Sequence, residues 1–366
     1  MIKEDQKLAL LDRYDPSWAM TPFWQGDTVY NESVVLIPDE NGVMRAPLFY
    51  RADRILSVRD DTLCRVFTPG VDYTLADNCL CAAPGSAMPH FTYDEFYCPD
   101  RVGEDVMDWD FGGHQRVAGG HFFYPKNLHV TYTHTDPWPF AVPPFKGDRL
   151  PRLMEKLNTC QVLTAVFYGD SVTSGDEVSG FLNIRPYQPI WTSMFCKRLQ
   201  SVYGCVTHEI DTALGGTDTF WGLEHARSRV AAFAPDLVLL GFGNNDRAPV
   251  EEYIGRIRQI ISAVREVSPH TEFILVDPMT PNRHIARSTD HYRWYALQDS
   301  YALAQHALER ELPGVAALEL MQLHLDMQTR KRFIDINANN INHPNDFFYR
   351  VIAQACAALV IPPERR

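Results

Sequence analysis

The sequence lacks any long run of apolar residues. Nowhere in its 366 residues does a stretch approach the roughly 20 that a membrane-spanning helix requires. Its first residues, MIKEDQKLALLDRYDPSW, carry charges where a secretory signal peptide has an apolar segment. We therefore expect a cytoplasmic protein that does not associate with membranes.

An excess of positive charge is also missing. Lys and Arg total 34 against 46 Asp and Glu, so the formal net charge is -12. A nucleic-acid surface needs clustered Lys and Arg to neutralise phosphates, and the sequence contains no such stripe. With 45% hydrophobic and 22% charged residues, the composition favours packed globular domains without nucleic-acid partners.

Cysteine motifs and phosphate-binding loops are absent too. Eight cysteines are scattered along the chain, and Cys79 and Cys81 lack the two-residue gap of a zinc or redox motif. Neither H-E-x-x-H nor G-x-x-x-x-G-K-[ST] occurs. We expect reduced, mostly buried thiols, no metal site and no cofactor.

The first part of the chain is typical of a β-sandwich. Short β-rich runs at 33–38, 63–70 and 129–135 are separated by turn-forming Gly, Pro, Asn and Asp. The Pro-rich stretch 137–148 can continue neither a helix nor a central strand, so it marks a crossing between domains. We predict a smaller N-terminal, jelly-roll-like β-sandwich over 1–148 and a second domain over 149–366.

The second part alternates apolar strand-like runs with helical patterns, which predicts an α/β domain with a parallel sheet. Apolar residues recur at helical spacing between Tyr253 and Val264, which predicts an amphipathic helix. A last helix is expected to begin at Asp346 and to be capped by it. The predicted strands lie at 161–168, 205–210, 236–242, 272–277 and 315–320.

Ser171 is the candidate nucleophile. It follows the first of these strands in the run Gly169-Asp170-Ser171, at the sheet edge where open α/β sheets place ligand crevices. The small residues after it allow a sharp turn into a helix, which leaves the Ser171 N–H to face an oxyanion. Asp170 is expected to support this turn by hydrogen bonding.

Three further loops leave the same edge. Gly215-Gly216-Thr217 follows the second strand and Gly243-Asn244-Asn245-Asp246 the third, and backbone N–H groups and an Asn amide are donors that stabilise negative charge. Asn342-His343-Pro344-Asn345-Asp346 precedes the last helix and offers an imidazole as a base. Ser171 is not in a G-x-S-x-G elbow, so the pattern is not that of an α/β-hydrolase lipase.

Together these blocks resemble, in order, the four signature blocks of the SGNH/GDSL hydrolase superfamily, over roughly residues 155–362. The resemblance implies a flavodoxin-like, three-layer α/β/α domain and a carboxylic ester hydrolase. It assigns Ser171 as nucleophile and His343 as general base, with an oxyanion hole made by Ser171, Gly216 and Asn245. Gly215 is an alternative to Gly216.

One block departs from the family pattern. Many relatives carry an aspartate three residues before the histidine, where this sequence has Asn340. An Asn cannot stabilise an imidazolium by charge, so a Ser-His dyad supported by Asn340 is the simplest arrangement. Asp335 or another loop carboxylate is the alternative, which would make a triad.

The predicted activity is hydrolysis of short-chain acyl esters, in particular acetyl esters and among them those of carbohydrates, by analogy with relatives that join a β-sandwich to this domain. Two alternatives use the same residues: a carbohydrate-binding protein on a decayed hydrolase scaffold, and an acyltransferase. Trp191 and Trp221 follow the first two blocks and are either sugar platforms or core aromatics. The sequence does not predict the oligomeric state.

Overall fold

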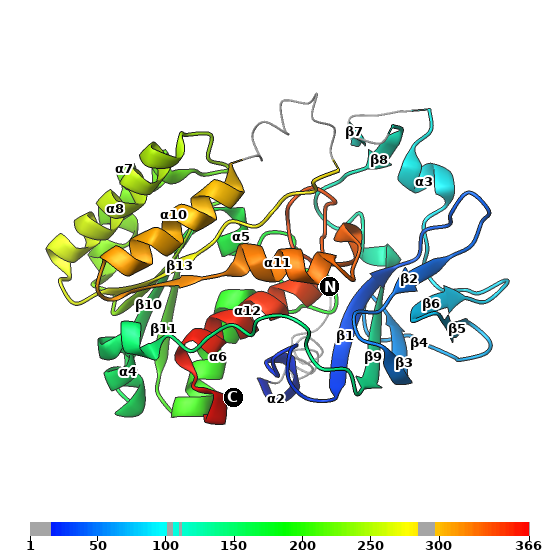
Figure 1. Ribbon diagram of the computed structural model, residues 1–366, viewed down its shortest axis with the longest axis horizontal. Helices are drawn as coiled ribbons and strands as arrows, with labels where there is room; N and C mark the ends of the chain where they lie inside the picture. The colour runs from blue at the N-terminus through cyan, green and yellow to red at the C-terminus, as the bar shows by residue number, and fades with distance from the viewer. Residues whose placement is uncertain (1–15, 101–104, 110–111, 285–296, 366) are drawn as a thin grey trace.

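A five-stranded parallel sheet forms the centre of the second half of the chain (Figure 1). The computed structural model describes residues 16–100, 105–109, 112–284 and 297–365. The strand order is β11-β10-β12-β13-β14, and each strand overlaps one of the five predicted runs, with β10 and β11 each ending one residue beyond its run. Their bounds are β10 (Leu163–Gly169), β11 (Thr207–Asp211), β12 (Leu237–Gly241), β13 (Glu272–Val276) and β14 (Val315–Leu318).

Helices cover both faces of this sheet. Alternate residues of a strand point to opposite faces, so Phe167 packs on one side with α6 and α12, and Tyr168 on the other with α7, α8 and α10. This confirms the predicted three-layer α/β/α fold. The helices are α6 (Trp191–Tyr203), α7 (Thr219–Arg229), α8 (Val250–Val267), α10 (Gln298–Glu311) and α12 (Asp346–Val360).

Two of these helices were predicted directly. In α8 the side chains of Tyr253, Ile257 and Val264 are buried, as the helical spacing indicated. The last helix begins at Asp346 as expected, but the capping side chain is that of Asn345, which accepts from Phe348 N at 3.1 Å. Asp346 is instead a buried residue of the first turn, and every residue of α12 is buried.

The N-terminal part is an antiparallel β region, as predicted. Its main sheet has the order β1-β9-β3-β4, and two smaller sheets have the orders β2-β6-β5 and β7-β8. The strands are β1 (Thr28–Val35), β2 (Arg45–Pro47), β3 (Ala52–Asp60), β4 (Val66–Phe67), β5 (Tyr73–Ala76), β6 (Cys79–Ala82), β7 (Val106–Asp108), β8 (His114–Arg116) and β9 (Asn127–His134).

A single hydrophobic core joins the two parts of the chain. Val34 and Tyr132 of the N-terminal sheet belong to the same buried cluster as Phe167 of the parallel sheet and Val351 of α12. The ring of Phe23 meets that of Phe347 edge-on, with centroids 5.2 Å apart. Figure 1 shows α12 between the parallel sheet and the N-terminal strands. This contact explains why α12 is buried on all sides.

The remaining elements are short. They are the helices α2 (Pro16–Ala19), α3 (Tyr93–Tyr97), α4 (Pro151–Asn158), α5 (Ser171–Ser174) and α11 (Leu320–Gln328), and the 3-10 turns η2 (Tyr124–Lys126), η3 (Gly147–Arg149), η4 (Ala231–Phe233), η5 (Phe333–Asp335) and η6 (Pro363–Arg365). Across the described ranges, no helix combines the length and apolar character needed to cross a bilayer. Four of the eight cysteines are buried: Cys98, Cys196, Cys205 and Cys356.

Candidate active site

Ser171 begins the short helix α5 directly after β10, and it is 4% exposed. The turn is tight because the ends of β10 and β12 approach closely. A Cβ on Gly169 would lie 2.1 Å from the carbonyl oxygen of Gly241, and the Thr173 hydroxyl already donates to that oxygen at 2.9 Å. Only glycine fits at 169, so this residue sets the position of the serine that follows.

Asp170 fastens the serine turn to the loop after β12. Its carboxylate accepts from Val172 N at 3.0 Å and from both the backbone N–H and the side-chain amide of Asn244, at 3.0–3.2 Å. Burial raises the pKa of this carboxyl from 3.8 to about 6, although the hydrogen bonds from Asn244 and Val172 oppose the rise. Asp170 therefore lies where a support for the turn was expected.

His343 reaches Ser171 from the loop before α12. Its Nε2 lies 2.9 Å from Ser171 Oγ, although the two residues are 172 positions apart in the chain. The Asn339 side-chain oxygen shapes this loop, because it accepts from the backbone N–H groups of Ile341, Asn342 and His343 at 2.9–3.1 Å. The structure thus brings the predicted nucleophile and base into hydrogen-bonding contact.

The predicted oxyanion-hole loops converge on the same edge. A Cβ on Gly215 would lie 3.6 Å from Ser171 Cβ, so the backbone after β11 passes directly beside the serine, and Gly216 follows with φ +77°. The Asn245 amide donates to Thr217 O at 3.0 Å and links the β12 loop to the β11 loop. Ser171, both glycines and Asn245 therefore belong to one cluster of loops.

Asn340 is directed away from the histidine that it was expected to support. Its Nδ2 donates to Arg116 O at 2.9 Å and to Gln115 Oε1 at 3.3 Å, and its Oδ1 accepts from Asn282 at 3.0 Å. Among the described contacts, none joins Asn340 to the imidazole of His343. Asn340 instead fastens the histidine loop to the N-terminal β region.

Asp335, the alternative carboxylate, has other partners. It is fully buried, and it accepts from Val35 N at 2.9 Å and pairs with Arg332 at 2.8 Å. Burial alone would raise its pKa, but the charges of Arg332 and Lys331 and the hydrogen bonds from Arg332 and Val35 N together outweigh burial and hold the pKa below its ordinary value. The Asp335 carboxylate therefore forms an ion pair with Arg332 and is not the partner of His343.

The sequence interpretation missed Glu177. Its Oε1 lies 3.6 Å from His343 Nδ1, on the side of the ring opposite Ser171. Glu177 is 8% exposed and belongs to the loop that follows α5. The only sequence signal is an acidic residue six positions after the serine, and that spacing does not tell where the side chain points.

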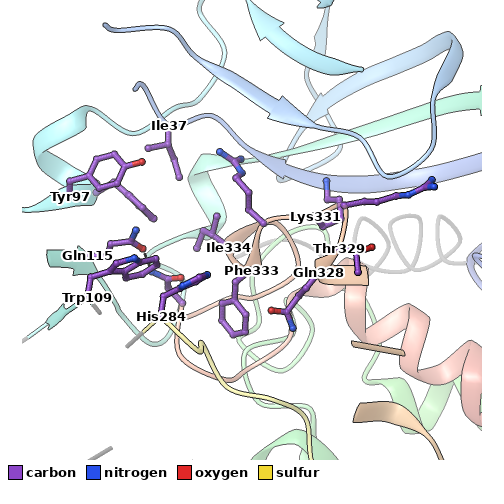
Figure 2. Close-up of a pocket in the computed structure, with 14 residues that line it drawn as sticks. Ile37, Tyr97, Trp109, Gln115, His284, Gln328, Thr329, Lys331, Phe333 and Ile334 are labelled. Atoms are coloured by element: carbon purple, nitrogen blue, oxygen red, sulfur yellow. Dashed lines mark hydrogen bonds between the residues drawn. The ribbon is translucent and has the colours of Figure 1, made fainter. Parts of the chain in front are cut away.

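A pocket of about 430 Å³ lies between the N-terminal β region and the loop that leads to α12 (Figure 2). Figure 2 shows Trp109 and His284 next to each other on one side of the pocket, with Gln328 and Lys331 on the other. The Trp109 and His284 rings stack with their centroids 4.9 Å apart. Asn340 also lines the pocket, which places the pocket beside the His343 loop. The other lining residues are Ile37, Phe96, Tyr97, Gln115, Thr329, Arg330, Arg332, Phe333 and Ile334.

Neither tryptophan near the first two blocks lines this pocket. Trp191 is 1% exposed and donates its indole N–H to Val172 O at 2.9 Å, so it is a core residue beneath the serine turn. Trp221 is partly buried and stacks on His225 with centroids 4.6 Å apart. Within the described ranges, no three His, Cys, Asp or Glu side chains gather as metal ligands.

Comparison with known families gives one sequence match. Residues 167–351, half of the chain, match the GDSL-like lipase/acylhydrolase family. The matched range runs from the end of β10 into α12 and contains Ser171, Gly216, Asn245 and His343. A comparison with curated proteins finds no match.

Solved structures that are similar to part of this chain include two esterases. A two-domain esterase active on acetylated mannans, crystallised with mannopentaose, has 18% identity and a TM-score of 0.45 over 57% of this chain and 52% of its own. A catalytic mutant of an acetylxylan esterase from Geobacillus stearothermophilus has 17% identity and a TM-score of 0.45 over 56% of this chain and 96% of its own. The chain thus spans about half the length of the two-domain esterase.

Proposed function

Because the chain belongs to the GDSL-like lipase/acylhydrolase family and is therefore a carboxylic ester hydrolase, we propose that it cleaves short-chain acyl esters with Ser171 as nucleophile and His343 as general base. The observation that carries the proposal is the 2.9 Å contact between Ser171 Oγ and His343 Nε2. A hydroxyl within hydrogen-bonding distance of an imidazole is the arrangement that activates a serine.

The reaction proceeds in two steps. His343 Nε2 takes the proton of Ser171 Oγ while that oxygen attacks the ester carbonyl carbon, and the imidazolium then gives the proton to the departing alcohol oxygen as the ester C–O bond breaks. His343 next removes a proton from water, which attacks the acyl-enzyme carbonyl. The acid leaves, and the proton returns to Ser171 Oγ.

The tetrahedral intermediates carry negative charge on the former carbonyl oxygen. We assign its stabilisation to the Ser171 N–H, the Gly216 N–H and the Asn245 amide, with Gly215 as the alternative glycine. Support comes from the approach of Gly215 to Ser171 and from the bond that holds the Asn245 amide against Thr217. Each such donor contributes roughly 10²–10³-fold to kcat in comparable enzymes.

An acetylated carbohydrate is the substrate that fits the surroundings best. The pocket beside the His343 loop combines the Trp109 and Tyr97 rings with the side-chain amides of Gln115 and Gln328. Aromatic faces pack against the C–H faces of sugar rings, and amides bind their hydroxyl groups. We propose that the sugar lies in this pocket while its acetyl group reaches Ser171.

Hydrolysis of p-nitrophenyl acetate tests the nucleophile. Ser171→Ala should lose nearly all turnover, and Asn245→Ala should lower kcat by roughly 10²–10³-fold. A fluorophosphonate probe followed by peptide mapping should label Ser171 in the unmodified protein. Normal turnover by Ser171→Ala, or label on another residue alone, would refute the assignment.

The substrate class needs a separate experiment. Rates on acetylated oligosaccharides should exceed those on simple acetate esters, and Trp109→Ala should raise KM for the oligosaccharides while leaving p-nitrophenyl acetate hydrolysis unchanged. Equal effects on both substrates would argue against a sugar in the pocket.

A further inference from the structure

The proposed function gives a role to Nε2 of the His343 imidazole but none to the other ring nitrogen, Nδ1. Nε2 must accept the proton of Ser171, so in the neutral ring the proton sits on Nδ1. Nδ1 is buried and has no hydrogen-bond partner among the described residues. A buried N–H that lacks an acceptor is costly, and an imidazole held from one side only can rotate or adopt the other tautomer.

Glu177 is the acidic side chain next to this nitrogen. The distance from its Oε1 to His343 Nδ1 is 3.6 Å, slightly beyond a hydrogen bond, and catalytic hydrogen bonds are often this loose before substrate binds. Its second oxygen, Oε2, is buried and also lacks a hydrogen-bond partner within the described part of the chain. The unpartnered Nδ1 thus faces Oε1 of a carboxylate whose other oxygen, Oε2, has no hydrogen-bond partner among the described residues.

The backbone around Glu177 is held in an unusual conformation. Its φ is +73°, in the left-handed region that non-glycine residues rarely adopt, so neighbouring contacts must maintain it. The Tyr124 hydroxyl lies 2.5 Å from Glu177 O and 2.8 Å from an oxygen of Asp346. Behind the carboxylate, a Cβ on Gly119 would approach Oε1 to 3.1 Å. The N-terminal β region therefore holds Glu177 in place.

The carboxylates next to Ser171 and Glu177 in the chain, and the one three residues after His343, have hydrogen-bond partners of their own. Asp170 binds Asn244 and Val172 N, and Asp346 accepts from Ser179 Oγ at 2.6 Å and from Tyr124. Asp176 accepts from Ser174 Oγ at 2.6 Å. Asn340, at the family's usual aspartate position, binds the N-terminal region instead.

We propose that Glu177 is the positioning residue of this site: it accepts the Nδ1 proton of His343, fixes the tautomer in which Nε2 faces Ser171, and stabilises the imidazolium by charge. This inference rests on the proposed roles of Ser171 and His343. The negative charge is supplied by Glu177 in the loop after the nucleophile. Asn340, at the family's usual aspartate position, instead binds the N-terminal β region.

The test compares three variants on p-nitrophenyl acetate. Glu177→Gln keeps the size of the side chain but removes the charge, and it should lower kcat roughly 10²–10⁴-fold with little change in KM. Glu177→Asp keeps the charge on a shorter side chain and should recover part of that loss. The exposed Glu224→Gln removes one negative charge elsewhere, on α7, and should retain the unmodified rate.

The pH profile separates positioning from a merely structural role. Loss of the carboxylate destabilises the imidazolium, so the acid limb of kcat/KM should move to lower pH in Glu177→Gln, by about one unit, and stay near the unmodified position in Glu177→Asp. The other ionisable groups that face this ring and Glu177 are unchanged in every variant, so the difference between profiles reports Glu177. They are Asp170, Asp176, Asp346, Tyr124 and Tyr349.

The outcomes are distinguishable. If Ser171→Ala is inactive while Glu177→Gln keeps its kcat and its acid limb, the role of Glu177 is overturned and the proposed function stands. A Glu177→Gln variant that loses activity with a lowered Tm and an unmoved acid limb also overturns it, because the residue is then only structural. If Ser171→Ala remains active, the proposed function itself fails.

Discussion

At the residue scale, Asp246 shows how a buried carboxyl group links the acidity of the solution to stability. It follows Asn245 and accepts from the backbone N–H of Thr219 at 3.1 Å and from the Thr219 hydroxyl. Burial raises its pKa from 3.8 to about 6, although the bonds from Thr219 oppose the rise. The folded protein therefore holds this proton more tightly than the unfolded chain does.

This shift predicts a pH dependence with a definite sign. A raised folded pKa gives a contribution that is complete below about pH 4 and is lost as pH rises through about 6, at most about 3 kcal/mol for this group. Asp246→Asn should therefore flatten the decrease in unfolding free energy between pH 5 and pH 8. Urea unfolding at pH 5, 6.5 and 8 measures this decrease, with the exposed Asp53→Asn as control. An unchanged slope in Asp246→Asn would show that another group carries the effect.

At the element scale, strand β1 and the segment after α11 are joined by a buried ion pair. Lys331 Nζ lies 2.7 Å from Glu32 Oε1, and both side chains are fully buried. Glu32 also accepts from Tyr132 Oη at 2.6 Å and from Phe49 N at 3.0 Å, while Lys331 donates to Pro47 O at 2.8 Å. Each charge is thus supported by neutral partners.

Removing the charge of Lys331 alone should lower the unfolding free energy more than removing the charges of both Lys331 and Glu32. Lys331→Met leaves the Glu32 carboxylate buried without its cation, so it should lower the unfolding free energy by about 3–5 kcal/mol. Glu32→Gln combined with Lys331→Met removes the isolated charge and should lower it less than Lys331→Met alone. Urea unfolding of Lys331→Met, of Glu32→Gln and of the double variant gives the coupling energy. Strictly additive losses would mean that the pair does not interact.

The strands show which sequence patterns were sufficient to predict secondary structure. The strands β10 to β14 were predictable because a parallel strand covered on both faces is a continuous apolar run. Strand β3 was missed because only Val58 in it is buried, so it lacks a repeating apolar pattern. The predicted run 63–70 forms a strand only at Val66–Phe67, since Leu63 has φ +59° in a turn built on the Asp60 carboxylate.

Some residues of the candidate site were predictable from the sequence and one, Glu177, was not. Gly216, Asn245 and His343 lie in loops that follow predictable strands or precede a predictable helix, and Ser171 begins a short helix after a predictable strand, so their shared edge could be foreseen. The position of Glu177 depends on a left-handed backbone and on Tyr124, which is 53 residues away in the chain. Such contacts between distant segments leave no periodic pattern in a single sequence.

At the scale of the whole molecule, the shared core predicts how the chain unfolds. Helix α12 packs between the parallel sheet and the N-terminal strands, and one buried cluster spans both parts. The two parts should therefore unfold in one transition, because exposing the N-terminal sheet also exposes α12. Scanning calorimetry should give a single peak whose calorimetric and van't Hoff enthalpies agree. Two separated peaks would contradict this expectation and favour independent domains.

The division into 1–148 and 149–366 remains a prediction about sequence organisation. The segment between β9 and η3 forms neither a helix nor a strand, as its prolines indicated. Its end is nonetheless tied to the second part, because Lys146 N donates to Leu359 O at 2.8 Å and Lys146 Nζ pairs with Glu309 at 3.0 Å.

The Tyr124 hydroxyl also bears on protein engineering. This one group contacts both the loop that carries Glu177 and the start of the helix that follows His343. A chimera that replaces the N-terminal region with an unrelated module would remove this hydroxyl from both contacts at once. Such a graft can succeed only if the new module presents a hydroxyl at the same point.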